Sequence, residues 1–337
     1  MIALTLEDCY SKVEIYIFIG LRAGHALGVT STAMYMNYDY SLNFLLAQFP
    51  KQLYICGGRD NSGSELSSLE RFDLATGLWQ ALPNMSVARV SAAAATLAGK
   101  LYVCGGCNTF DVALGLVERF DPLLCLWEQM PEMLLPRRAC VAVSLANTLY
   151  VCGGCFREPL KSMESFDPNL MRWELNVHMM TKRWAPAAAA VFGQIYMCGG
   201  MDGEGSILSS CEQFDPRVND WFHLPSMSSC RFAAAATSHK GIVYVCGGQS
   251  MLNMTSSVEC FDTVNSSWTV LDMMSCGRRA PGVVALDGRI YVFGGRTASG
   301  GSSSVECYDP ESGSWENEVA SMNCARIHPA SAALRVL

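Results

Sequence analysis

Charge is scarce in this sequence of 337 residues, and positive charge does not cluster in it. Only 16% of the residues are charged, and the formal net charge is −7. The longest runs of Lys and Arg are pairs such as Arg137-Arg138. Because binding to nucleic acid phosphates needs a basic stripe, the sequence predicts that nucleic acid is not a partner.

Long apolar runs are also missing, although half of the residues are hydrophobic. A membrane-spanning helix needs about 20 apolar residues, and the best candidate, residues 15–21 (IYIFIGL), is far shorter. This segment follows Glu7 and Asp8 instead of a basic lead-in, so it makes a poor secretory signal. We therefore expect a cytoplasmic protein that has no membrane partner.

Patterns of catalytic and metal-binding residues are absent too. The histidines show no ligand spacing; they are His25, His178, His223, His239 and His328. No Gly-x-Ser-x-Gly motif and no phosphate-binding glycine loop is found. Two Cys-Gly-Gly-Cys runs, Cys104–Cys107 and Cys152–Cys155, have the spacing of redox pairs and zinc sites. Because the first cysteine of each run belongs to a repeat, we interpret these cysteines as apolar fillers; a zinc site is the alternative. We therefore expect no catalytic residue, metal or cofactor.

One motif is present six times. The sequence LYVCGG occurs at Leu101–Gly106 and again at Leu149–Gly154, and four looser copies stand elsewhere. The first glycines of the six copies are Gly57, Gly105, Gly153, Gly199, Gly247 and Gly294. Their spacing of 46 to 48 residues indicates an array of repeated structural units.

Every unit carries the same landmarks after its glycine pair. A Glu-x-aromatic-Asp motif comes about 15 residues later, a tryptophan follows the Asp, and a Met-x-x-x-Arg motif follows the tryptophan. Between these landmarks lie four short β-branched or aromatic segments, and no helix-period stretch is long enough to compete with them. The pattern predicts an all-β protein: a six-bladed β-propeller with four-stranded antiparallel blades.

The residue types of each unit suit positions in a blade. The first segment is small and apolar, as in Ala187–Val191, because inner strands crowd around the propeller axis. The tryptophan should fill the gap between blades. Five of the sixteen cysteines precede a glycine pair, and Phe293 replaces cysteine in the sixth unit, so this position needs an apolar filler and the thiols should be reduced. The repeat arginines either bond to carbonyls and the repeat glutamates or contact a partner.

The chain ends inside a repeat. Residues Arg326–Leu337 (RIHPASAALRVL) contain the arginine and the small first segment of a unit and then stop, whereas the first unit lacks this entry before Leu53. We therefore expect the C-terminal strand to become the inner strand of the first blade and to close the ring. Residues 43–49 (NFLLAQF) are the alternative for that strand. The propeller would occupy residues 51–337, and residues 1–50 would form no complete domain.

These landmarks together resemble the kelch repeat over about residues 51–337, and they are most similar to the propellers of BTB–kelch proteins. Members of that family are typically substrate adaptors of cullin ubiquitin ligases or actin-associated proteins. The resemblance implies a protein-interaction module that selects substrates for a cullin-type ubiquitin ligase; an actin-associated scaffold is the first alternative. Since residues 1–50 do not match a BTB or BACK domain, a cullin complex would need another chain. Galactose oxidase has a similar architecture, but its copper ligands find no counterpart in this sequence, so an oxidase is the least favoured alternative.

Two loops of each unit should emerge on one face around the mouth of the channel: the loop after the glycine pair and the loop that enters the first strand. Their residues differ among the units, as expected of a rigid scaffold that presents variable contacts. BTB–kelch adaptors bind acidic peptides at matching positions, so the resemblance implies a protein or acidic peptide partner for this chain. The partner-binding candidates are Arg59, Ser91, Arg138, Phe156, Trp184, Phe232, Arg279, Arg296 and His328.

Overall fold

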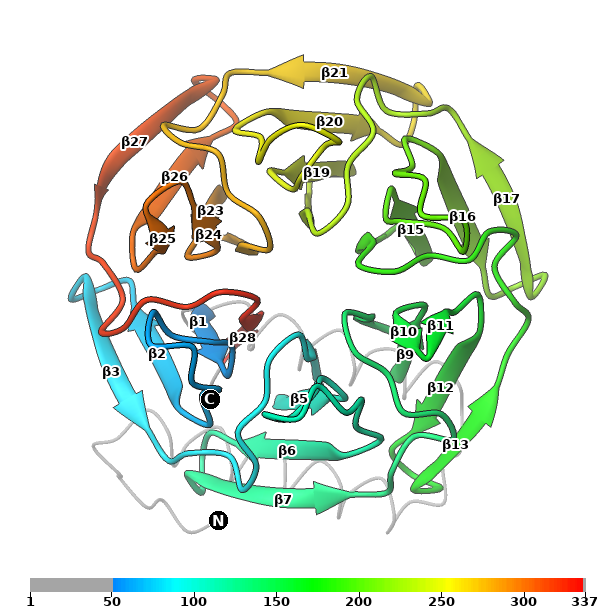
Figure 1. The fold of residues 1–337 in the computed structure, drawn as a ribbon, viewed down its shortest axis with the longest axis horizontal. Helices are drawn as coiled ribbons and strands as arrows, with labels where there is room; N and C mark the ends of the chain where they lie inside the picture. Colours follow the sequence, from blue (N-terminus) through cyan, green and yellow to red (C-terminus); the bar gives the residue numbers. More distant parts are fainter. Residues whose placement is uncertain (1–50, 336–337) are drawn as a thin grey trace, which may run out of the picture. The chain divides into compact units, whose positions relative to one another are not determined.

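The structure is a computed structural model that describes residues 51–335. Six four-stranded antiparallel sheets stand as blades around a common axis (Figure 1). This arrangement confirms the predicted all-β, six-bladed propeller. In the described part of the chain, no helix is long and apolar enough to cross a membrane. The prediction for residues 1–50 lies outside the described residues.

The blades follow one another along the chain, and each has an inner strand near the axis and an outer strand at the rim. From the inner to the outer strand, blade 1 consists of β28 (Ala330–Arg335), β1 (Lys51–Cys56), β2 (Leu69–Asp73) and β3 (Leu78–Leu82). Blade 2 consists of β4 (Ala93–Leu97), β5 (Lys100–Cys104), β6 (Val117–Asp121) and β7 (Leu126–Met130). Blade 3 consists of β8 (Val141–Leu145), β9 (Thr148–Cys152), β12 (Met163–Asp167) and β13 (Arg172–Leu175). Blade 4 consists of β14 (Ala187–Val191), β15 (Gln194–Cys198), β16 (Cys211–Asp215) and β17 (Asp220–Leu224). Blade 5 consists of β18 (Ala235–His239), β19 (Ile242–Cys246), β20 (Val258–Asp262) and β21 (Ser267–Leu271). Blade 6 consists of β22 (Gly282–Leu286), β23 (Arg289–Phe293), β26 (Val305–Asp309) and β27 (Ser314–Val319). Two small hairpins add β10 (Cys155–Phe156) with β11 (Glu158–Pro159), and β24 (Arg296–Thr297) with β25 (Gly300–Gly301).

Blade 1 is built from both ends of the propeller. Strand β28 lies beside β1 as the innermost strand (Figure 1). Just before β28, Ile327 and Arg59 exchange two backbone hydrogen bonds of 2.9 Å. The predicted closure by the C-terminal strand is therefore confirmed. The alternative, in which residues 43–49 take this position, is not what the structure shows.

A buried Arg–Glu pair holds each blade together. In blade 4, the Arg183 guanidinium lies 2.8 Å from Glu212 Oε1 and donates to the carbonyl oxygen of Gly199 at 2.7 Å. Glu212 also accepts a hydrogen bond from the backbone amide of Met180 at 2.8 Å. The equivalent pairs are Arg89–Glu118, Arg137–Glu164, Arg231–Glu259, Arg278–Glu306 and Arg326–Glu70. The interpretation that the repeat arginines bond to carbonyls and the repeat glutamates is therefore confirmed.

Each repeat tryptophan joins its blade to the preceding blade. In blade 4, Trp221 Nε1 donates to the carbonyl oxygen of Val177, which lies between blades 3 and 4 along the chain, at 3.3 Å. The Trp221 side chain is 2% exposed and packs against Phe214 with ring centroids 5.3 Å apart. The predicted position of the tryptophans between blades is confirmed.

We expect Trp221→Ala to lower the free energy of unfolding by about 3–5 kcal/mol, because truncation leaves a cavity where two blades meet. Chemical denaturation of the full chain measures this change. Trp315→Ala is the matched control, since Trp315 makes the same bond to Asp272 at 2.9 Å but is only partly buried. Equal losses in the two variants would contradict the argument from burial.

Candidate partner-binding face

An isolated β-bridge joins the two variable loops in every blade. The bridge links the residue after the repeat arginine to the residue after the glycine pair. The six bridges are Ile327 with Arg59, Val90 with Cys107, Arg138 with Cys155, Trp184 with Met201, Phe232 with Gln249, and Arg279 with Arg296. The prediction that these loops emerge together is therefore confirmed. We call the surface formed by these twelve residues the bridge face.

The glycine pairs allow the backbones to approach each other at this face. In blade 4, a Cβ atom on Gly199 would lie 2.4 Å from the carbonyl oxygen of Arg231, in the next blade. A Cβ atom on Gly200 would lie 3.0 Å from the carbonyl oxygen of Trp184, across the bridge. Both glycines have positive φ, at 62° and 97°, a region that other residues rarely adopt. The glycine pair is therefore needed for the close approach of the backbones at the bridge.

A closed ring of backbone hydrogen bonds surrounds the axis next to the bridge face. Each amide of the ring donates to the carbonyl oxygen of the equivalent residue in the preceding blade, at 2.7 to 3.3 Å. The six residues, which we call the axial collar, are Ser91, Ala139, Ala185, Ala233, Ala280 and His328. All have φ between 48° and 57°, although none is glycine. Conformations of this kind persist only where the surrounding structure imposes them, in this case by closure of the ring.

The collar and the inner strands line an axial cavity of about 150 Å³. Its walls are mostly alanine, and Ser91 and His328 are among its few polar residues. Burial lowers the pKa of His328, and together with the nearby Arg279 and Arg59 it brings the pKa to about 3. His328 is therefore neutral at physiological pH. The structure places Ser91 and His328 in this cavity, apart from the other predicted residues, which lie in the loops.

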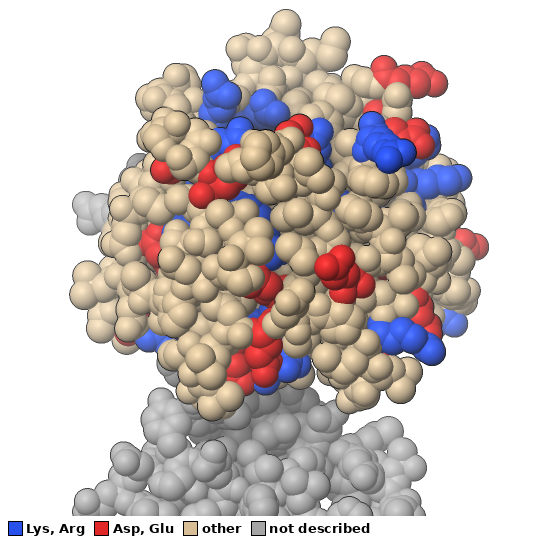
Figure 2. All heavy atoms as spheres, turned by 60° about the horizontal axis from the view of Figure 1, so that its bottom comes forward, with Lys and Arg blue, Asp and Glu red and all other residues tan. Residues whose placement is uncertain are grey.

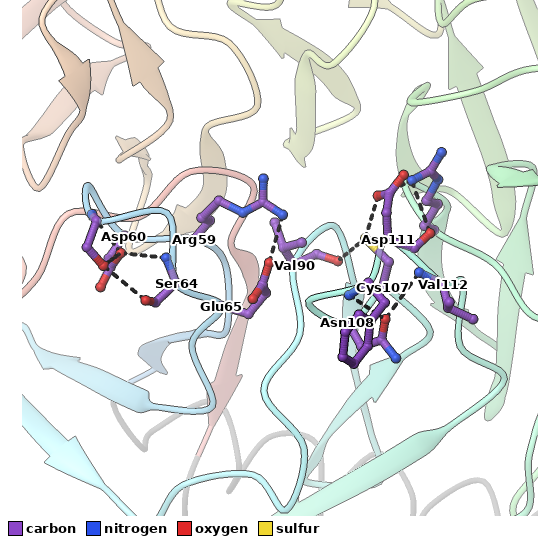
Figure 3. Close-up of polar contacts among 12 residues, drawn as sticks. Arg59, Asp60, Ser64, Glu65, Val90, Cys107, Asn108, Asp111 and Val112 are labelled. Atoms are coloured by element: carbon purple, nitrogen blue, oxygen red, sulfur yellow. Dashed lines mark hydrogen bonds and ion pairs between the residues drawn. The ribbon is translucent and has the colours of Figure 1, made fainter.

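The four candidate arginines divide into two pairs. Arg59 lies 2.7 Å from Glu65, and Arg138 forms an ion pair with Asp111, so their charges are neutralised within the chain. Figure 3 shows Arg59 next to Glu65 and places Asp111 in the loop that follows Cys107. Within residues 51–335, neither Arg279 nor Arg296 has an acidic partner. These two arginines face each other across the bridge of blade 6.

Two aromatic residues, in blades 4 and 5, lie next to Arg279. The rings of Trp184 and Phe232 are 5.8 Å apart, and the Arg279 guanidinium lies 5.2 Å from the Phe232 ring centroid. Phe232 is only 6% exposed, so it supports its neighbours and offers little surface of its own. In the part of the chain that the structure describes, the buried Nε1 atom of Trp184 and the buried Nε atom of Arg279 have no hydrogen-bond partner. We call Trp184, Phe232, Arg279 and Arg296 the cationic–aromatic row.

Phe156 is separate from this row. It lies in the small β10–β11 hairpin of blade 3, where the Arg157 guanidinium stands 5.4 Å from its ring centroid. The nine predicted residues therefore fall into four groups: the row, the axial cavity, the two neutralised arginines and Phe156. Their role in binding stays a prediction.

Three exposed apolar side chains near this face were not predicted from the sequence. Phe110 is 84% exposed, Met251 77% and Leu252 87%. They occupy the segments that follow the bridge residues Cys107 and Gln249 in blades 2 and 5. The sequence feature that could have indicated them is their position between the glycine pair and the Glu-x-aromatic-Asp motif, where the units differ most.

Charge on the visible side of the propeller is mixed. In Figure 2, basic and acidic side chains are interspersed over a mostly uncharged surface, without a continuous basic stripe. Among the described residues, no group of three or more His, Cys, Asp or Glu side chains is placed to hold a metal ion.

A closed ring of six blades with variable loops on one face defines a repeat propeller of the kind that presents loop residues for binding. The kelch motif matches residues 42–86, 88–134, 136–175, 183–228, 230–274 and 277–323. The chain belongs to the kelch-repeat family. The first match starts at residue 42, whereas the structure gives the inner position of blade 1 to β28.

Similarity to a solved structure agrees with this fold. The structure described as "Structure of YjhT" has a TM-score of 0.68 and 16% sequence identity, and the match covers 78% of this chain and 96% of that chain. At this identity the likeness concerns the fold alone. Comparison with curated protein sequences gave no significant match.

Proposed function

We propose that this propeller is a non-enzymatic protein-interaction module that binds an acidic segment of a partner protein at the cationic–aromatic row. In this proposal it acts in the cytoplasm and selects substrates for a cullin-type ubiquitin ligase whose cullin-binding part is another chain. The resemblance to BTB–kelch propellers suggests the ligase role. The observation that carries the binding role is the pair Arg279 and Arg296, which have no acidic partner among residues 51–335.

The contacts of the row favour a carboxylate as the ligand group. Arg279 is half-buried, and burial together with the nearby Arg296 lowers its pKa. A carboxylate from a partner would stabilise both charges and would form short charge-assisted hydrogen bonds.

The geometry also favours a protein partner. Trp and Arg are the residue types that most often dominate the energy of protein interfaces. The exposed tips at Phe110 and at Met251-Leu252 add apolar contact beyond the row. A partner with an acidic centre and apolar flanks would match both features.

Charge removal at the row tests the binding role. The probes are peptides rich in Asp and Glu and the same peptides with Asn and Gln instead. We expect Arg279→Gln/Arg296→Gln to weaken binding of the acidic peptides by about 30-fold or more, which corresponds to at least 2 kcal/mol. Arg59→Gln/Arg138→Gln is the matched control, because these charges are already paired, and it should change affinity by less than about threefold. Equal effects of the two double variants, or equal binding of the amide peptides, would overturn the proposed site.

The ligase role needs a separate experiment. Affinity purification of the tagged full chain from cells, followed by mass spectrometry, should recover cullin subunits together with substrates. The Arg279→Gln/Arg296→Gln variant should lose the substrates and keep the cullin. Recovery of actin without a cullin, supported by co-sedimentation with filaments, would favour the scaffold alternative. Turnover of a small substrate by the purified chain would contradict the non-enzymatic part of the proposal.

A further inference from the structure

Blade 4 contains two cysteines that face each other across adjacent strands. Cys198 is the last residue of β15, Cys211 is the first residue of β16, and the two are direct partners in the antiparallel register. The neighbouring pair is hydrogen-bonded, with the Gly199 amide donating to the Ser210 carbonyl oxygen at 3.1 Å. Because hydrogen-bonded and non-hydrogen-bonded pairs alternate, Cys198 and Cys211 form a non-hydrogen-bonded pair, whose Cα atoms lie about 4.5 Å apart.

This spacing suits a disulfide. Bridged cysteines usually have Cα atoms about 4.4–6.8 Å apart, and both side chains point to the same side of the sheet because they are direct partners. In the reduced protein the Cys211 thiol donates a hydrogen bond to the backbone carbonyl oxygen of Ser209 at 3.6 Å. In the structure both are free and almost fully buried.

The pair is specific to blade 4. In the other five blades the residue before the glycine pair faces Leu, Met or Val on the next strand. These pairs are Cys56 with Leu69, Cys104 with Val117, Cys152 with Met163, Cys246 with Val258, and Phe293 with Val305. An apolar filler therefore suffices at this place in the fold, and the second cysteine of blade 4 is not required by the repeat.

The surroundings of Cys211 lower the pKa of its thiol. The contact with Cys198 contributes most to the lowering; burial opposes it, and the Arg183 guanidinium and the backbone amides of Met227 and Gly199 add to it. The thiolate is the form of cysteine that reacts with peroxides. The same contact and burial raise the pKa of Cys198.

We propose that Cys198 and Cys211 are a reversible oxidation site that forms a disulfide on reaction with hydrogen peroxide. The Cys211 thiolate attacks one oxygen of the peroxide; an S–O bond forms, the O–O bond breaks, and the released hydroxide takes up a proton to become water. Cys198 then gives up its proton and attacks the Cys211 sulfur; the S–S bond forms, the S–O bond breaks, and the second oxygen leaves as water. The two thiols lose two electrons and the peroxide gains them.

The disulfide would fasten the base of a loop at the bridge face. The connection Gly199–Ser210 starts directly after Cys198 and ends directly before Cys211, and it carries Met201, the bridge partner of Trp184. Oxidation would therefore restrain the loop beside the cationic–aromatic row. The oxidation site itself does not depend on the proposed function of the row.

Peptide mapping of the full chain tests the proposal. Cys125 is exposed, so the experiment uses the Cys125→Ser chain to prevent crosslinks between molecules. The folded protein is treated with hydrogen peroxide, unfolded, alkylated with iodoacetamide and digested with trypsin. Residues 184–217 contain no internal Lys or Arg, and their only cysteines are Cys198 and Cys211. We expect this peptide to lose both alkyl groups after peroxide and to regain both after dithiothreitol.

Two controls define the outcome. The tryptic peptide 52–59 contains only Cys56, whose strand partner is Leu69, and it should stay alkylated. In Cys211→Val, which places the residue of blades 2, 5 and 6 at this position, Cys198 should stay alkylated after peroxide. If peptide 184–217 of the unsubstituted pair keeps both alkyl groups, or carries a sulfinic acid on one cysteine while the other is alkylated, the proposal is overturned.

Discussion

Deletion of residues 326–337 is expected to abolish cooperative unfolding of the propeller. The deletion removes β28, so β1 loses the strand beside it and blade 1 retains only β1, β2 and β3. It also removes the Arg326 guanidinium, which lies 2.6 Å from Glu70 and donates to the Gly57 carbonyl oxygen at 2.8 Å. Glu70 would then be a buried carboxylate without its cation.

The axial collar fails in the same variant. His328 accepts a hydrogen bond from the Ser91 amide and donates one to the Ala280 carbonyl oxygen, both of 3.3 Å, so its removal opens the ring of hydrogen bonds. Breaking a buried ion pair by removing one partner costs about 3–5 kcal/mol. Since domains have a total stability of about 5–15 kcal/mol, the loss of the pair, the strand and the collar together should leave little folded protein.

Circular dichroism during heating and in guanidinium checks this result. A chain that lacks only residues 336–337 is the matched control, because it keeps β28 (Ala330–Arg335). The control should unfold at the midpoint of the full chain. A cooperative transition of the long deletion within a few degrees of that midpoint would show that the C-terminal strand does not hold the ring closed.

The second large effect is expected from Glu212→Ala, which should lower the free energy of unfolding by about 3–5 kcal/mol. The Glu212 and Arg183 side chains are both 0% exposed, so the substitution leaves the guanidinium buried without its counterion. The amides of Met180 and Thr181, which donate to Glu212 at 2.8 and 3.1 Å, lose their acceptor as well. Leaving a buried donor unpaired adds to the loss.

Chemical denaturation and a double-mutant cycle measure this effect. Arg183→Met/Glu212→Leu removes both charges and should be more stable than Glu212→Ala, because no buried charge is left alone. Glu316→Ala is the matched control, since Glu316 pairs with Arg289 at an exposed site; its loss should not exceed about 1 kcal/mol. Similar losses in Glu212→Ala and Glu316→Ala would contradict the view that burial sets the energy of these pairs.

The fold could be predicted almost completely from the sequence, because each repeat encodes contacts within one blade. The spacing of Arg183, Glu212 and Trp221 recurs in every unit, and each side chain bonds within its own blade or to an adjacent blade. The closure by β28 was predictable for the same reason: residues Arg326–Leu337 carry the start of a unit that could be completed only by the strands after Leu53.

The candidate site was predicted only as a set of positions. The sequence showed which loops would share a face, but it did not show which arginines would find acidic partners. Glu65 and Asp111 lie in loops with no repeat pattern, and the conformations of those loops bring them to Arg59 and Arg138. Burial of Phe232 also depends on its neighbours Trp184 and Arg279, which come from other blades.

Residue order alone was enough for the number of blades, the strands of each blade and the closure of the ring, because these features repeat along the chain. Tertiary structure decided the features that join blades or adjacent strands: the axial collar, the bridge that brings Arg279 next to Arg296, and the pairing of Cys198 with Cys211. The collar shows the reason most clearly. An alanine such as Ala185 has no preference for positive φ, and it adopts 49° because its amide and carbonyl bond to the neighbouring blades on either side.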